Sequence, residues 1–64
     1  MELDFGTIMK ALPEGYTLKQ LAKDVGVSQQ TIQNWKNGNS QPYGKNLRKL
    51  LQITKLSYLQ IWKS

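Results

Sequence analysis

The stretch between residues 29 and 34 is dense in amide side chains at helical spacing. Gln29 and Gln30 stand together, and Asn34 follows one turn later, so a helix would place Gln30 and Asn34 on one face. An amide has both a donor and an acceptor, and Gln or Asn can bond adenine N6 and N7 together in the major groove of DNA. We therefore expect Gln29, Gln30 and Asn34 to read base edges, with the more sideways Gln33 as a weaker candidate. The alternative interpretation is an ordinary solvated helix face.

These amides need a helix held at a fixed angle to its support, and the flanking sequence has the pattern of a helix-turn-helix. Residues 18–24 and 29–36 predict two short helices joined by a tight turn that contains Gly26. Gly26 can adopt the positive φ that the turn needs, and the small Ala22 lets the second helix approach the first closely. Within the expected motif, residues 17–36, the structural positions are predicted to be Leu21, Ala22, Val25, Gly26, Val27, Ile32 and Trp35.

Helix signals elsewhere predict one compact all-α domain of five short helices over residues 1–64. The other helices are expected at about 5–12, at about 44–52 and after Ser57, and no strand pattern is convincing. The apolar spacing in the first of these predicts a buried face of Phe5, Ile8, Met9 and Leu12.

Capping signals mark several of the predicted helix ends. Asp4 and Ser28 are candidate N-caps, because each can accept a free N–H of the first turn. Thr17 and Gln20 have the spacing of a capping box. Gly38 suits the left-handed residue that ends a helix.

The charged residues are divided unevenly along the chain. Nine Lys and Arg oppose four acids, and all four acids lie at or before Asp24. The residues after Asp24 therefore create a positive electrostatic field, which favours binding of a polyanion. A surface that serves only solubility would have the same composition. We expect phosphate contacts around the amide-rich helix and at the backbone N–H groups that begin the helix at 18–24. The candidates, each with a solvated polar side chain as its alternative, are Thr17, Leu18, Lys19, Thr31, Lys36, Asn37, Asn39, Ser40 and Lys45.

The composition lacks the residues for several chemistries. There is no Cys and no His, which removes disulfides, thiolate metal sites and the commonest metal ligand and general base. Because the few carboxylates are scattered, no acid–base pair is indicated, and we expect neither an enzyme nor a metal, cofactor or small-molecule ligand. No segment resembles a signal peptide or a membrane span, so the expected compartment is the cytoplasm.

The aromatic side chains have more than one interpretation. Trp35 could be a stacking platform for single-stranded nucleic acid, but its place three residues after Ile32 favours the core. Tyr58 and Trp62 are either part of the last core layer or part of a dimer patch, and the sequence leaves both open. Two tyrosines that flank loops are predicted to pack as lids: Tyr16 and Tyr43.

From Thr17 to Trp62 the chain resembles the phage repressor and Cro family, the lambda-repressor-like DNA-binding domains. The resemblance is carried by LAKDVGVSQQTIQNWKNG at 21–38, NSQPYGKNL at 39–47 and LSYLQIW at 56–62. It implies a five-helix fold, base reading by the first two glutamines and the asparagine named above, and a homodimer at least on DNA. It also implies a palindromic double-stranded operator whose half-sites lie about 34 Å apart, one helical turn.

One departure from that family concerns Leu18. Many members have a Gln there that contacts a DNA phosphate. In this chain the phosphate contact at this point must therefore come from backbone N–H groups and Lys19. The short chain favours a small Cro-like regulator of transcription, of phage or prophage type, in a bacterial host cell. The alternative is an antitoxin or accessory module that has the same fold but binds another protein.

Overall fold

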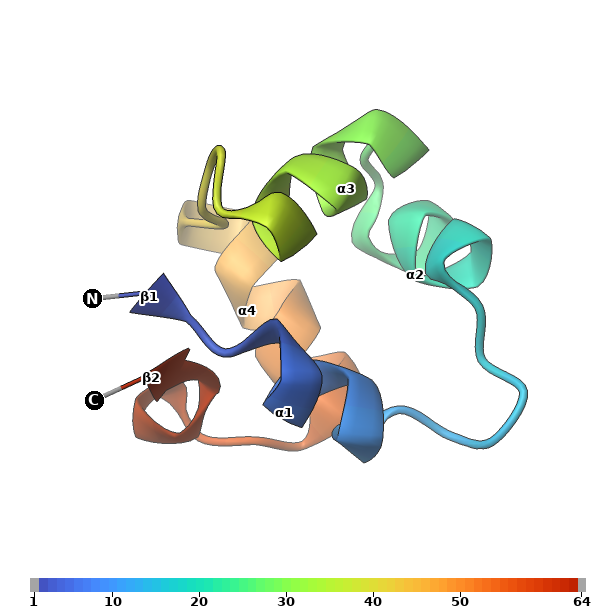
Figure 1. The fold of residues 1–64 in the computed structure, drawn as a ribbon. Coiled ribbons are helices and arrows are strands. Elements are labelled where there is room, and N and C mark those ends of the chain that lie inside the picture. Colours follow the sequence, from blue (N-terminus) through green and yellow to red (C-terminus); the bar gives the residue numbers. More distant parts are fainter. Residues whose placement is uncertain (1, 64) are drawn as a thin grey trace.

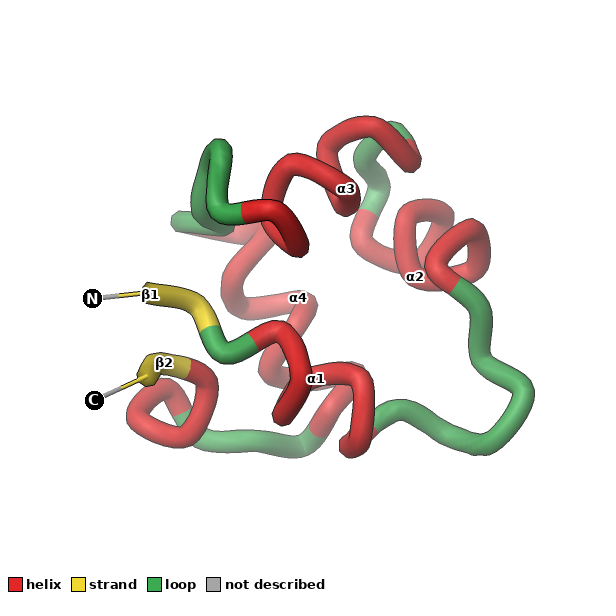
Figure 2. The backbone as a smooth tube through the Cα atoms, viewed as in Figure 1, coloured by secondary structure: helices red, strands yellow, loops and turns green. Residues whose placement is uncertain are grey.

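The computed structural model describes residues 2–63, so the first and last residues of the expected 1–64 domain lie outside the described residues. Short helices surround a common interior, and two short strands bring the ends of the described chain together (Figure 1, Figure 2). In chain order the elements, of which η1 is a 3-10 helix, are β1 (Glu2–Leu3), α1 (Phe5–Ala11), α2 (Leu18–Val25), α3 (Gln29–Asn37), α4 (Gly44–Thr54), η1 (Tyr58–Ile61) and β2 (Trp62–Lys63).

The expectation of five α-helices and no strands is wrong: residues 2–63 form four α-helices, one turn of 3-10 helix and two strands. η1 has only four residues, and the chain becomes extended at Trp62, where β2 pairs antiparallel with β1 and Leu3 faces Trp62. The N–H of Asp4 also donates to the carbonyl of Ile61 at 2.7 Å. Strands of two residues are too short to show an alternating pattern, so the sequence could not indicate them.

The predicted N-caps of α1 and α2 are present. Asp4 accepts the N–H of Thr7 at 3.2 Å and its hydroxyl at 2.7 Å, and these two bonds, the hydroxyl's first, hold the pKa of Asp4 below its ordinary value. Thr17 accepts the N–H of Gln20 at 3.1 Å. The capping box expected there is only half formed, because the Gln20 amide donates to Asp24 at 2.9 Å instead of returning to Thr17.

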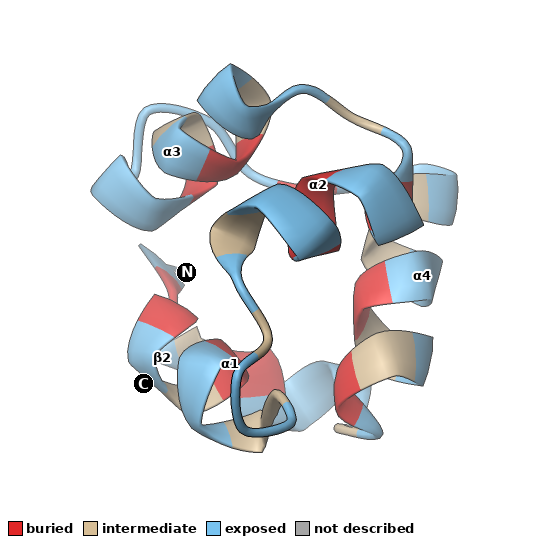
Figure 3. Ribbon diagram, turned by 90° about the vertical axis from the view of Figure 1, so that its right-hand side faces the viewer, coloured by how far each residue is buried: buried red, intermediate tan, exposed pale blue. Residues whose placement is uncertain are grey.

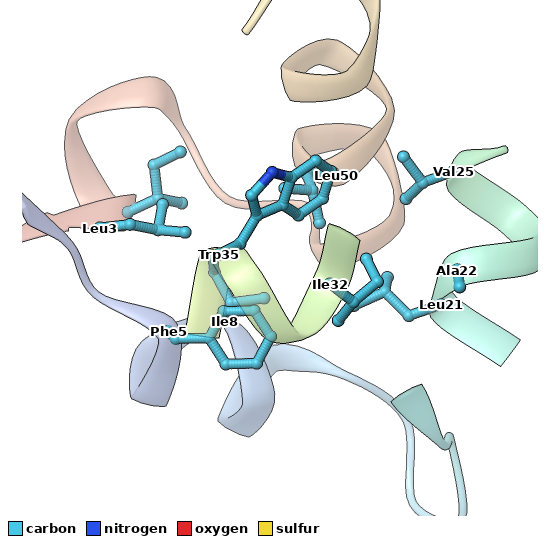
Figure 4. Close-up of a cluster of buried hydrophobic side chains, with 10 residues drawn as sticks. Leu3, Phe5, Ile8, Leu21, Ala22, Val25, Ile32, Trp35 and Leu50 are labelled. Atoms are coloured by element: carbon cyan, nitrogen blue, oxygen red, sulfur yellow. The ribbon is translucent and has the colours of Figure 1, made fainter. Parts of the chain in front are cut away.

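α2 and α3 meet across a short turn. Gly26 has a φ of 89°, and the N–H groups of Gly26 and Val27 donate to the carbonyl of Ala22 at 2.8 and 2.9 Å. Ile32 of α3 is fully buried and lies beside Leu21 and Ala22 of α2 (Figure 4). The predicted structural side chains are buried, apart from the half-buried Val27. α3 is thus held by its inner side, while its outer side is exposed (Figure 3).

The core continues from α3 towards α1, α4 and the two ends of the chain. Ile8, Leu50 and Ile61 are fully buried in the same cluster as Trp35. Met9, expected to face inward, is 38% exposed. It lies at the open edge beside β1, because α1 is only seven residues long and buries a single narrow stripe.

α4 supports the end of α2 through Lys49. Its ammonium Nζ lies 3.4 Å from the carbonyl oxygen of Val25, the last residue of α2. The end of a helix has carbonyls without intrahelical donors and a negative dipole, so a cation there is stabilising.

Tyr16 holds the loop before α2 against that helix. Its hydroxyl donates to the carboxylate of Asp24, which also accepts the amide of Gln20. Burial, followed by the hydrogen bond to Asp24 and its charge, raises the pKa of Tyr16 to about 12. Tyr16 is half-buried, in agreement with the prediction of a lid.

We predict that Gly26→Ala lowers the free energy of unfolding by about 1–2 kcal/mol, because an L side chain is strained at positive φ. Steric overlap adds little, since the nearest atom to the new Cβ is Lys49 Nζ at 3.7 Å. Gly6→Ala in α1 is the matched control: it also has free space and should raise stability by about 0.5–1 kcal/mol. Urea unfolding measures both, and an equal effect of the two substitutions would contradict the account of the turn.

We predict that Tyr16→Phe lowers the free energy of unfolding at pH 7 by about 0.5–1 kcal/mol, the value of one hydrogen bond. The raised pKa of Tyr16 means that the unfolded phenol ionises near pH 10, while the folded phenol ionises near pH 12. The contribution of Tyr16 is therefore complete below pH 10 and is lost as the pH rises to 12. Unfolding of both proteins across this range should show their stabilities converging. If the difference in stability between the two proteins stayed constant from pH 10 to pH 12, the raised pKa assigned to Tyr16 would be contradicted.

Candidate nucleic-acid interface

The outer face of α3 presents the amides that the sequence singled out. Gln29, Gln30 and Gln33 are exposed, and Asn34 is half-buried. Gln30 Nε2 donates to Asn34 Oδ1 at 3.2 Å, so these two side chains meet one turn apart on the same face. The structure therefore brings Gln30 and Asn34 together, whereas Gln29 and Gln33, which are also one turn apart, both lie to the same side of that pair.

The bond between Gln30 and Asn34 orients both side chains and still leaves hydrogen-bonding groups free for a partner. One N–H of Gln30 is used, and its other N–H and its carbonyl oxygen remain; both N–H groups of Asn34 remain. Donors and acceptors are thus side by side on an exposed helix face. This arrangement matches the pairs of donors and acceptors at base edges in the major groove.

The inner face of α3 explains why the amides point outward. Ile32 and Trp35 are buried, which fixes the rotation of the helix about its axis. Ser28 starts the helix by accepting the N–H of Thr31 at 3.1 Å, and Gly38 ends it at a φ of 79°. Trp35 is 3% exposed and lies in the core, so it offers no stacking platform.

The chain after α3 folds back onto the end of that helix. The N–H groups of Asn39 and Ser40 donate to the carbonyl of Asn34 at 2.8 and 3.4 Å. The predicted phosphate contacts at the end of α3 and just after it are accessible, because all four are exposed: Lys36, Asn37, Asn39 and Ser40.

Three of the predicted phosphate-contacting residues come together from separate elements. Thr31 of α3, Ser40 of the connector and Lys45 of α4 line one surface hollow of about 420 Å³. Thr31 is half-buried, and its hydroxyl lies 3.0 Å from that of Ser28.

The other predicted phosphate contacts lie at the start of α2, on the opposite side of α3 from the connector (Figure 1). The Leu18 side chain packs against the core, so only its backbone could meet a phosphate. Lys19 and Thr17 are exposed, and the Thr17 hydroxyl accepts the N–H of Gln20. Other N–H groups of this first turn have no acceptor within the helix.

The C-terminal aromatic residues are divided between core and surface. Trp62 is half-buried with its indole Nε1 shielded, and Tyr58, 48% exposed, meets the Trp62 ring edge-on at 5.8 Å. Leu59 is 79% exposed and was not singled out from the sequence. A single turn cannot bury all four apolar side chains that segment 58–62 contains around Gln60, and this was the signal that could have identified Leu59 as exposed.

The prediction that Tyr43 packs as a lid is wrong, because Tyr43 is 82% exposed. No group of three or more potential metal-ligating side chains occurs within residues 2–63. In the same part of the chain, no helix has the length and apolar character needed to cross a bilayer.

Comparison with known proteins gives one finding. A family model described as helix-turn-helix matches residues 9–61, which includes all four α-helices except the start of α1. No curated protein and no solved structure matches the chain. Because the matched range covers most of the sequence, the chain belongs to the lambda-repressor-like, XRE-type helix-turn-helix family of DNA-binding transcription regulators.

Proposed function

We propose that this protein is a sequence-specific transcription regulator of the phage Cro or repressor type, which binds a palindromic operator as a homodimer. The observation that carries the proposal is the bonded pair of Gln30 and Asn34 on the exposed face of α3. α3 enters the major groove, where its first turn lies closest to the bases. Gln29 and Gln30, in the first turn, meet base edges, Asn34 contributes from one turn further along the helix, and Gln33 lies at the margin.

Electrostatics supports the same placement of DNA. From Val25 to the end of the sequence there are basic residues and no acid, so α3, the connector after it and α4 have no negative side chain. Lys36, in the last turn of α3, and Lys45, in the first turn of α4, are both exposed. Cations at these places neutralise phosphates on both sides of the groove, which sets affinity and register without reading sequence.

The homodimer would use three apolar residues at the C-terminal end, which we call the C-terminal patch: the exposed Tyr58 and Leu59 and the half-buried Trp62. Leu59 and Tyr58 are exposed apolar neighbours, and the Tyr58 ring stacks edge-on against Trp62. Two copies joined through a symmetric patch present two α3 helices to one face of DNA. This geometry corresponds to a palindrome with half-sites about one turn apart.

We predict that Gln30→Ala weakens binding to the cognate duplex by about 1–3 kcal/mol and relaxes the preference at one base pair. The matched control is Gln52→Ala, which removes an exposed amide from α4 and should change nothing. Fluorescence anisotropy on cognate and random duplexes separates the cases. An equal loss on both duplexes would show that Gln30 does not read bases.

We predict that Lys36→Ala weakens binding to all duplexes alike and lowers the slope of log K against log salt by about one unit. Lys10→Ala is the control, because Lys10 is an exposed lysine on α1 that is not among the predicted phosphate contacts. Titrations at several salt concentrations measure the slope. An unchanged slope would remove Lys36 from the phosphate contacts.

We predict that Leu59→Asp, which puts a charge into the C-terminal patch, reduces the complex on a palindromic duplex from two copies to one. Leu59 is 79% exposed, so the fold should survive, and circular dichroism checks this. Gln52→Asp adds the same charge on exposed α4 and should leave two copies bound. Sedimentation velocity counts the copies, and two bound copies of Leu59→Asp would exclude the patch as the dimer interface.

A further inference from the structure

Tyr43 stands between α3 and α4 with its ring in solvent. It is 82% exposed, although the residue before it, Pro42, is buried. Buried Pro42 fixes the backbone at this point, and α4 begins at the next residue, Gly44. A lone exposed tyrosine is common on protein surfaces. What distinguishes Tyr43 is the surface on which it is held.

Tyr43 lines the hollow of about 420 Å³ beside the recognition helix. One wall is α3, with Thr31 and the edge of Trp35, and the other wall is the segment from Ser40 through Asn46. The residues that line the hollow therefore combine the apolar side chains of Trp35 and Pro42 with hydroxyl, amide and ammonium groups. It is adjacent to the α3 face that we propose reads bases.

The charge around the hollow is positive. Lys45 is one of its lining residues, and the lining includes no acid. All four acids of the sequence lie at or before Asp24, outside the elements that form the walls. An anionic chain with an apolar, ring-shaped component fits this surface, and the sugar–phosphate backbone of DNA has that chemistry.

We propose that the hollow receives the sugar–phosphate backbone of one DNA strand and that Tyr43 is a DNA-binding residue. The Tyr43 ring packs against a deoxyribose, its hydroxyl donates to a phosphate oxygen, and Lys45 pairs with the neighbouring phosphate. This inference rests on the proposed function and adds to it an uncharged contact. It also states on which side of α3 the strand passes.

The contact by Tyr43 has a signature that differs from that of a lysine. A neutral side chain releases no condensed counterion, so its loss weakens binding without changing the salt dependence. Tyr43→Ala should weaken binding to cognate and random duplexes by about five- to tenfold, and Tyr43→Phe, which loses the hydroxyl alone, by about threefold. Both should leave the salt slope as it is in the unmodified protein. Lys45→Ala should lower that slope by about one unit.

The path of the strand can be mapped directly, because the chain contains no cysteine. Tyr43→Cys then provides a single thiol to which an iron-chelate cleavage reagent is attached. Glu14→Cys is the control, an exposed position in the loop between α1 and α2. This loop and α3 lie at opposite ends of the view in Figure 1. On a saturated cognate duplex, the reagent at position 43 should cleave one short stretch of backbone beside each half-site. The reagent at position 14 should give no local cleavage.

The outcomes separate this inference from the proposed function. If Gln30→Ala loses base preference while Tyr43→Ala binds unchanged and position 43 gives no local cleavage, the inference is wrong and the proposed function remains. If the unmodified protein binds no duplex, both are wrong. Local cleavage at position 43 together with the weakened binding of Tyr43→Ala at constant salt slope supports the assignment.

Discussion

The packing of α3 on α2 through Ile32 is the interaction on which the rest of the structure depends. Ile32 is fully buried beside Leu21 and Ala22, and the turn between the helices closes on the carbonyl of Ala22. A larger residue at Ala22 would push α3 outward. A residue other than glycine at 26 would strain the turn, whose φ is 89°. The angle between α2 and α3 therefore depends on the residues at positions 22 and 26.

The other helices hold α3 in place through contacts with its buried side and with α2. Trp35, on the buried side of α3, belongs to the same core cluster as Ile8, Leu50 and Ile61. The elements α1, α4 and η1 therefore support α3 from the core side. The bond from Lys49 to the end of α2 supports the other half of the motif. Because the inner side is fixed in this way, Gln30 and Asn34 share the outer side of α3, where their side chains are hydrogen-bonded to each other.

The sequence predicted the elements that have local signals. The periodic apolar positions and the caps Asp4, Thr17 and Ser28 were sufficient for α1 to α3, and Gly26 and Gly38 have the positive φ expected of them. Contacts between distant residues had no such signal. The pairing of β1 with β2 joins residues some sixty positions apart. Because the chain enters β2 at Trp62, the segment expected to form a fifth α-helix has room only for the 3-10 turn η1.

The candidate site was predictable to a similar degree. Gln30 and Asn34 share a face because their spacing requires it, but their mutual hydrogen bond depends on rotamers. Gln20 illustrates the same limit, since its amide reaches Asp24 rather than Thr17. Tyr43 lies outside any helical period, so its exposure depends on how Pro42 and the connector pack. The hollow beside α3 likewise arises only when three elements meet.

Selection from a random duplex pool at about 150 mM salt, followed by sequencing, tests the central claim that α3 reads bases. The account predicts an enriched palindrome whose half-sites are centred about ten base pairs apart. Salt-sensitive binding without any enriched sequence would contradict it, because the amide face of α3 would then contribute no specificity.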